Sequence, residues 1–266
     1  MKVFVIDVKN CTGCYSCQIA CKDEHCGNDW TPYAKPQPDW GHFWGKLNYY
    51  ERGQIPQVRV AHVFVPCQHC DDAPCIKACP ETAISKRADG LVWIDPKKCT
   101  GCQLCLPACP YGAIFYNAQL HLAQKCTGCA HLIDRGWKEP RCADACPQLA
   151  IKFGEEAELK DLIAKAEILH PEYGLKAKVY YIGLPKRFIA GTVYDPGTKE
   201  VVIGATCTLT GQGGPFTVTT DNFGDFWFDG LAAADFTLKI EKAGKTKTMA
   251  VSTKEEDKGL GDIPLS

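Results

Sequence analysis

Eighteen cysteines stand out in this 266-residue chain because many of them recur at regular spacing. The clearest run is Cys99-x2-Cys102-x2-Cys105-x3-Cys109, followed by Pro110. Thiolates bind soft metals, and a C-x2-C-x2-C-x3-C-P run is typical of cysteines that hold cubane iron–sulfur clusters. In such a run the fourth cysteine ligates a different cluster from the first three. The run therefore predicts a partner run elsewhere in the chain.

Three further runs repeat this spacing with small departures. The first has lysine in place of proline, the second has one gap widened to four residues, and the fourth has a long insertion after its second cysteine. In chain order they are Cys11, Cys14, Cys17 and Cys21-Lys22; Cys67, Cys70, Cys75 and Cys79-Pro80; and Cys126, Cys129, Cys142 and Cys146-Pro147. Sixteen cysteines thus fall in four runs, and Cys26 and Cys207 lie outside them. Four cubanes with four thiolate ligands each would use all sixteen.

Disulfide bonds and zinc are the alternatives to iron–sulfur clusters. Disulfide-rich chains are typically secreted, whereas the N-terminal segment MKVFVIDVKNC indicates a strand that leads into the first run, not a signal peptide. Structural zinc takes four ligands, commonly as two separated pairs, and does not explain runs of four followed by proline. We therefore expect iron, bound through the sixteen cysteines.

The bulk composition argues against several other functions. The formal net charge is −1, so no large positive field indicates a nucleic-acid partner. No apolar stretch is long enough for direct membrane insertion. No Ser/His/Asp set, phosphate loop or carboxylate pair stands out beside the cysteines, so no catalytic residue and no substrate site are expected on this chain. These features predict a cytoplasmic protein, or one exported together with a signal-bearing partner.

The elements that must position the cysteines are short. Three runs end in the repeat Cys-Pro-x-x-Ala-Ile, which indicates a bacterial-ferredoxin-like unit that occurs twice. Strands are expected at residues 1–10, 60–66, 90–94 and 113–116. Residues 155–170 carry apolar side chains at helical spacing and are expected to form a helix.

An aromatic-rich insertion over residues 27–66 separates the first two runs. Seven aromatic residues fall between Trp30 and Tyr50, and three prolines argue against a regular helix there. Exposed aromatic residues are common at protein interfaces. The insertion is therefore expected either to contact a partner chain or to cover the first cluster within this chain.

From residue 187 onward the sequence has short alternating segments separated by turn residues. Strands are expected at residues 189–194, 201–209, 216–220, 225–229, 235–241 and 245–251. Such a series predicts a small antiparallel β-sandwich, with Cys207 as a buried apolar residue. The sandwich resembles the transthyretin and carboxypeptidase-regulatory domains. The predicted fold is α+β: a four-cluster domain over 1–153, a helix and connector over 154–186, and the sandwich over 187–266.

Six cationic residues lie beside cysteines of the runs. They are Lys22, Lys77, Lys97, Lys98, Lys125 and Arg141. A cation close to an anionic cluster raises its reduction potential, whereas a solvated surface lysine does little. Both alternatives stay open from the sequence. His69 is interpreted as an ordinary loop residue, because cysteines already fill the ligand sets.

The four runs resemble the four-cluster iron–sulfur subunits of the dimethyl sulfoxide reductase family of molybdopterin oxidoreductases over residues 1–153. The sandwich, Trp40, Gly41-His42 and Glu51-Arg52-Gly53 more closely resemble the small subunits of the pyrogallol–phloroglucinol transhydroxylase branch. The resemblance implies four [4Fe–4S] clusters on this chain and an anaerobic, heterodimeric enzyme. It also implies a large catalytic partner subunit that alone carries the molybdopterin cofactor, with molybdenum or tungsten.

The nested order of the runs, together with this resemblance, implies four ligand sets. Set 1 is Cys11, Cys14, Cys17 and Cys146; set 2 is Cys21, Cys126, Cys129 and Cys142; set 3 is Cys79, Cys99, Cys102 and Cys105; and set 4 is Cys67, Cys70, Cys75 and Cys109. The resemblance further implies that sets 1 and 2 lie nearer the catalytic subunit.

The expected function is electron transfer between that catalytic subunit and an external carrier, in the hydroxylation or dehydroxylation of an aromatic substrate. A transhydroxylase small subunit with no net electron flow and a free-standing polyferredoxin are the alternatives. The third run is complete here, whereas the resemblance implies a degenerate third run in the transhydroxylase branch, so net redox chemistry is favoured. The insertion and the sandwich argue against a polyferredoxin, since a free carrier needs neither.

Overall fold

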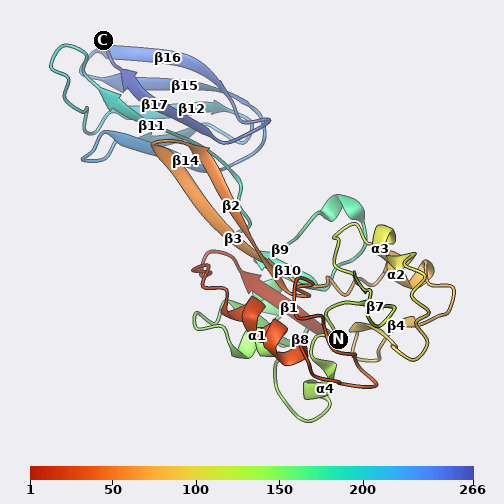
Figure 1. The fold of residues 1–266 in the computed structure, drawn as a ribbon. Coiled ribbons are helices and arrows are strands. Elements are labelled where there is room, and N and C mark those ends of the chain that lie inside the picture. The colour runs from red at the N-terminus through yellow and green to blue at the C-terminus, as the bar shows by residue number, and fades with distance from the viewer. The chain divides into compact units, whose positions relative to one another are not determined.

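The computed structural model describes residues 1–266, which divide into two compact units (Figure 1). The first unit comprises Met1–Tyr49 and His62–Leu184, and the second comprises Tyr50–Ala61 and Pro185–Ser266. Short strands predominate in both. The longest helix, α1 (Ser16–His25), has 10 residues, and every other helix has four or fewer.

A four-stranded sheet forms the centre of the first unit. Its strands, in spatial order, are β8 (Ile151–Glu155), β1 (Lys2–Asp7), β10 (Val179–Ile182) and β9 (Glu167–Ile168). β1 runs parallel to β10 and antiparallel to β8. The continuous apolar run of β1 is typical of a strand that is buried on both faces. Phe4, Ile6 and Tyr181 accordingly lie in the core with almost no exposed surface.

The helix predicted for residues 155–170 is reduced to a single turn, α6 (Lys160–Ile163). β8 continues to Glu155, and Ile168 in β9 pairs with Tyr180 of β10. Sheet pairing thus occurs at Ile168, within the segment whose periodicity predicted a helix, so tertiary contacts override local propensity there. Residues 154–184 consequently belong to the first unit and do not form a separate connector.

Small hairpins and one-turn helices surround the cysteine runs. The hairpins are β4 (Ile84–Lys86) with β5 (Val92–Ile94), and β6 (Phe115–Asn117) with β7 (Leu122–Gln124). The short helices are α2 (Pro74–Lys77), α3 (Cys105–Ala108), α4 (Ala130–Ile133), α5 (Arg141–Asp144) and the 3₁₀ turn η1 (Pro171–Tyr173). α1 packs against α5, and α2 packs against α3. The first unit therefore contains two pairs of cysteine-bearing helices, α1 with α5 and α2 with α3.

The second unit is a two-sheet β-sandwich. One sheet has the order β14 (Asp225–Leu231), β11 (Arg187–Tyr194), β17 (Lys258–Pro264), and the other β13 (Phe216–Thr219), β12 (Thr206–Gly211), β15 (Asp235–Lys242), β16 (Lys245–Ser252). Ile189, Leu209, Phe226 and Leu238 belong to its core. β11 and β17 run parallel, so the prediction of a wholly antiparallel sandwich is wrong for this pair.

The aromatic-rich insertion continues into a hairpin of β2 (Lys46–Gln54) and β3 (Gln57–Val65). The tip of this hairpin, Tyr50–Ala61, belongs to the second unit. There the Gln54 Oε1 accepts a hydrogen bond of 2.7 Å from the Gly259 amide. The two units therefore interleave along the chain. The sequence had instead suggested a single boundary before the sandwich.

Candidate metal centres

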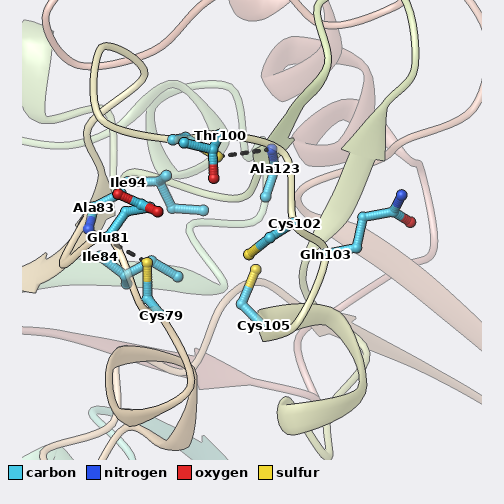
Figure 2. Close-up of a pocket in the computed structure, with 11 residues that line it drawn as sticks. Cys79, Glu81, Ala83, Ile84, Ile94, Thr100, Cys102, Gln103, Cys105 and Ala123 are labelled. Atoms are coloured by element: carbon cyan, nitrogen blue, oxygen red, sulfur yellow. Dashed lines mark hydrogen bonds between the residues drawn. The ribbon is translucent and has the colours of Figure 1, made fainter.

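Three cavities of the first unit are each lined by four cysteines. The first has Cys11, Cys14, Cys17 and Cys146; the second has Cys67, Cys70, Cys75 and Cys109; and the third has Cys79, Cys99, Cys102 and Cys105. Figure 2 shows the sulfurs of Cys79, Cys102 and Cys105 pointing toward one common space. The structure thus brings together the members of sets 1, 4 and 3.

The members of set 2 are buried together. Burial raises the pKa of Cys142 well above its ordinary value, and the neighbouring thiols of Cys129, Cys21 and Cys126 raise it further. Cys21 is affected in the same way, first by burial and then by Cys126 and Cys129. Thiols that disfavour one another's ionisation must lie close together. Twelve cysteines therefore line three shared cavities, and the four of set 2 are buried neighbours of one another.

The sulfurs of sets 1, 3 and 4 surround a space rather than a point. No group of three His, Cys, Asp or Glu side chains is close enough to hold one metal ion, whereas zinc would need thiolates at about 2.3 Å. A space bounded by four thiols suits a cluster whose irons lie at its corners. Buried polar atoms without a partner occur near the same cysteines: His25 Nδ1, Trp44 Nε1, His69 Nε2 and Thr127 Oγ1. Such atoms usually have a hydrogen-bond partner, and the residues present fit an iron–sulfur cluster that would supply one.

The helix pairs explain which runs share a group. α1 carries Cys17 and Cys21, and it packs against α5, which carries Cys142. The first and fourth runs therefore contribute jointly to sets 1 and 2. α2 carries Cys75 and packs against α3, which carries Cys105. The second and third runs contribute jointly to sets 3 and 4 in the same way.

The Cys-Pro-x-x-Ala-Ile repeat has a conformational cause. The residue before the alanine has a positive φ in each copy: 49° at Thr82, 59° at Gly112 and 50° at Leu149. This left-handed residue turns the alanine N–H back toward the cysteine. Ala83 donates to Cys79 Sγ and Ala150 donates to Cys146 Sγ, both at 3.3 Å. Hydrogen bonds to the ligand sulfurs favour their charged form and tune cluster potentials.

Cys21 lies within α1 and lacks the proline turn. A backbone hydrogen bond from Gly45 lowers its pKa against the larger raising effect of burial. Trp44, only 1% exposed, belongs to the same apolar cluster as Cys21. Trp44 of the insertion therefore covers set 2. The expected cover of the first cluster comes from Leu47 and Phe64 of the same insertion, which line the set 1 cavity. Trp40 of the same insertion is 89% exposed and is free to contact a partner.

Burial raises the pKa of many thiols in these groups. It raises the pKa of Cys17, Cys70 and Cys105 to about 12, and that of Cys75 and Cys126 to about 11. Exposed Cys14 differs, since a hydrogen bond with Ser16 lowers its pKa. Because metals bind thiolates, cluster assembly must release the protons of the buried thiols.

The four groups adjoin one another in the order 1, 2, 4, 3. Cys17 and Cys142 share one core cluster, Cys126 and Cys67 share a second, and Cys75 and Cys105 share a third. Groups 1 and 3 form the ends of this series. Each has one exposed cysteine, Cys14 and Cys102 respectively. The arrangement is a row of four sites with solvent access at both ends.

Two buried histidines beside set 2 were not recognised from the sequence. The rings of His25 and His131 lie 5.3 Å apart, and His131 Nε2 contacts Glu24 Oε1 at 2.9 Å. His25 Nε2 lies 3.9 Å from Cys129 Sγ. Burial lowers the pKa of His25 to about 3, so its ring is neutral. His25 follows Cys21 by one helical turn, and this spacing is the sequence signal that could have placed it beside set 2.

Two further residues beside the cysteines differ from the simplest interpretation of the sequence. His69 is 1% exposed, and its Nδ1 accepts a 2.9 Å hydrogen bond from the Val92 amide. The prediction of an ordinary loop residue therefore does not account for its burial. Among the six cations, Lys125 alone is buried; Lys77, Lys97 and Lys98 are exposed, and Lys22 and Arg141 are partly exposed.

Cys26 and Cys207 belong to none of the four groups. Cys207 is fully buried in the sandwich core, and burial raises its pKa to about 12. Cys26 is partly exposed, and its Sγ donates to Asp39 Oδ1 at 3.4 Å.

Two family models match separate parts of the chain. Residues 58–156 match the 4Fe-4S dicluster domain, and residues 189–265 match the carboxypeptidase regulatory-like domain. The sandwich is therefore a carboxypeptidase-regulatory-like β domain. No helix has both the length and the apolar character needed to cross a membrane.

Several curated relatives share most of the chain. It is 36% identical to the pyrogallol hydroxytransferase small subunit of Pelobacter acidigallici, over 98% of both chains. It is 34% identical to a subunit of tetrathionate reductase from Salmonella typhimurium, over 70% of this chain and 73% of that one. It is 37% identical to a subunit of the anaerobic dimethyl sulfoxide reductase of Escherichia coli, over 62% and 80% respectively. The four cysteine groups and these relationships together show that the protein belongs to the family of [4Fe–4S]-containing iron–sulfur subunits of the molybdopterin oxidoreductases.

Proposed function

We propose that sets 1 to 4 each hold one [4Fe–4S] cluster and that the chain relays single electrons between a molybdopterin-containing catalytic subunit and an external one-electron carrier. The observation that carries this proposal is the unbroken order 1, 2, 4, 3 of four complete cysteine groups. A bound [4Fe–4S] cluster supplies reversible one-electron chemistry. The chain holds the ligand sulfurs, excludes water from the inner sets, and donates N–H groups to the thiolates of Cys79 and Cys146.

Set 1 is proposed to face the catalytic subunit and set 3 the carrier. Tyr15, Ile19 and Leu149 expose apolar surface near the set 1 end, as Leu104 does near set 3. Apolar surface of this kind is typical of docking sites. Each electron that enters at one end is matched by one that leaves at the other. A two-electron conversion on the partner therefore consumes or supplies two equivalents of a one-electron carrier.

A hydroxylated aromatic compound is the substrate class we propose for the partner subunit. The support is the match to a pyrogallol hydroxytransferase small subunit over nearly the whole chain, sandwich included. The same match favours a second candidate function, in which this chain serves a transhydroxylase and no net electron flow occurs. The complete set 3 argues against that alternative, since internal hydroxyl transfer has no use for a row of sites that leads to the surface.

The test is turnover of the purified complex with and without an artificial one-electron dye. Cys102→Ala removes an exposed ligand at the far end of the row, and Cys26→Ala is the matched control outside every set. We expect dye-dependent turnover to fall at least tenfold in Cys102→Ala and to be unchanged in Cys26→Ala. Full turnover without any carrier, unaffected by Cys102→Ala, would instead support the transhydroxylase function.

A further inference from the structure

Lys125 is a buried cation at the junction of two cysteine groups. Only 2% of the residue is exposed. It directly precedes Cys126 of set 2, and it also lines the cavity of set 4. Its position therefore places one positive charge beside the two inner members of the row.

The hydrogen bonds of Lys125 leave its charge without a carboxylate partner. Its Nζ donates to the backbone carbonyls of Val92 and Cys126, the latter at 2.9 Å. Both acceptors are neutral. A buried ammonium group is costly unless an anion compensates it. Ligand thiolates of sets 2 and 4 are suitable anions, because Lys125 lines one cavity with Cys75 and Cys109 and directly precedes Cys126.

The other cations beside the cysteines have different surroundings. Lys97 and Lys98 are exposed, so water screens them. Arg141 pairs with Glu24 and Asp144. Lys22 is partly exposed and donates to the carbonyls of Pro38 and Gly41. Lys125 is the cation whose desolvation and lack of a carboxylate leave its full field acting on the ligand groups.

We propose that Lys125 is a fixed cation that raises the reduction potentials of the set 2 and set 4 clusters together. Reduction adds a negative charge, and a nearby desolvated cation stabilises the reduced state more than the oxidised one. A shared cation shifts both inner sites in the same direction, which keeps them matched to each other for electron passage. This inference rests on the proposed ligand sets.

The sequence offers a matched control for the test. Lys98 and Lys125 each begin the identical pentapeptide Lys-Cys-Thr-Gly-Cys, yet Lys98 is exposed. Lys125→Gln removes the charge and keeps a hydrogen-bond donor, Lys125→Arg keeps the charge, and Lys98→Gln removes an exposed charge from the same local sequence. The midpoint potentials of the purified complex would be measured by redox titration followed by electron paramagnetic resonance, together with iron content.

In Lys125→Gln we expect the reduced-to-oxidised ratio of two clusters to fall at least tenfold at a fixed solution potential, a shift of about 59 mV per tenfold for a one-electron couple. The other two clusters should be unchanged, and Lys125→Arg and Lys98→Gln should leave both inner clusters at wild-type potentials. If Lys125→Gln fails to assemble two clusters while Lys125→Arg assembles all four, the requirement for charge is also supported.

Wild-type iron content with four unshifted potentials in Lys125→Gln would overturn the inference, as would a loss of the inner clusters in Lys125→Arg as well. Failure of the underlying ligand assignment is distinguishable, because it would appear in the wild-type protein as fewer than four cluster signals.

Discussion

The ion pair between Arg52 and Asp257 lies within the second unit and joins the hairpin tip to the sandwich strands. Arg52 Nε and Nη2 each donate to a different Asp257 oxygen at 2.9 Å, and the Phe188 amide donates to Asp257 Oδ1 at 2.9 Å. The Asp257 side chain is 3% exposed and that of Arg52 is 17% exposed. Replacing Arg52 by Met would therefore leave a buried carboxylate with one of its three donors.

Losing one partner of a buried ion pair lowers the free energy of unfolding by about 3–5 kcal/mol. Two lost hydrogen bonds to a charged group, at about 1.5–3 kcal/mol each, give a similar magnitude. Since about 1.4 kcal/mol corresponds to tenfold, the slowest-exchanging amides of β11 and β17 should exchange about 100-fold faster or more. Hydrogen exchange followed by mass spectrometry reports this locally, so the result does not depend on how the two units unfold.

Lys254→Met is the matched control, because Lys254 pairs with Asp235 where both side chains are more than half exposed. Water screens such an exposed pair, so exchange should change less than tenfold. The double variant Arg52→Met/Asp257→Asn should recover part of the loss, since it removes the buried charge and keeps an acceptor for Phe188. Exchange in Arg52→Met within threefold of wild type would refute the reasoning.

Three further predictions concern the cysteines and the metal. Cys105→Ala should remove or convert one cluster, a loss of up to about four of about sixteen irons by elemental analysis, whereas Cys207→Ala should retain the wild-type iron content; a loss of four irons in the Cys207 variant would contradict the assignment. Burial raises the pKa of Cys17, Cys70 and Cys105 above that of a free thiol, so these thiols ionise first in the unfolded chain. The cluster-free chain should therefore be most stable below pH 9 and lose stability as the pH rises toward 12. Urea denaturation at several pH values measures the free energy of unfolding, and a stability that rises over that range would contradict the prediction. Removal of iron with a chelator should increase hydrogen exchange in β4 to β7 around the ligand sets and leave β11 to β17 unchanged, because every assigned ligand lies in the first unit; equal loss of protection in the sandwich would show that the two units are not independent.

The chemistry of the first unit could be predicted because its determinants are local. The spacing of Cys99, Cys102 and Cys105 depends on a short loop, and the left-handed residue in each Cys-Pro-x-x-Ala-Ile repeat acts within five residues. The alternating strands of the sandwich are equally local signals. Neither kind of signal depends on how distant segments meet. The four cysteine runs and the β domain could therefore be predicted from the sequence, whereas the assignment of the runs to ligand sets also used the family resemblance.

The positions that sequence reasoning missed all depend on distant segments. Ile168 lies in a strand because Tyr180 of β10 is available to pair with it, and the hairpin tip joins the second unit because Gln54 meets Gly259. His25 and His131 come together from segments more than 100 residues apart. Local periodicity carries no information about such partners.

The two Lys-Cys-Thr-Gly-Cys segments illustrate the difference between what the local sequence determines and what distant packing determines. The sequence by itself predicted ligands in both, because the spacing of their cysteines and the positive φ of Gly101 and Gly128 are properties of the loop alone. The tertiary structure alone decided that Lys98 is exposed and Lys125 is buried. The physical reason is that desolvation depends on everything packed around a group. Lys125 lies between two cysteine groups brought together from different runs, whereas Lys98 lies beside set 3 at the end of the row.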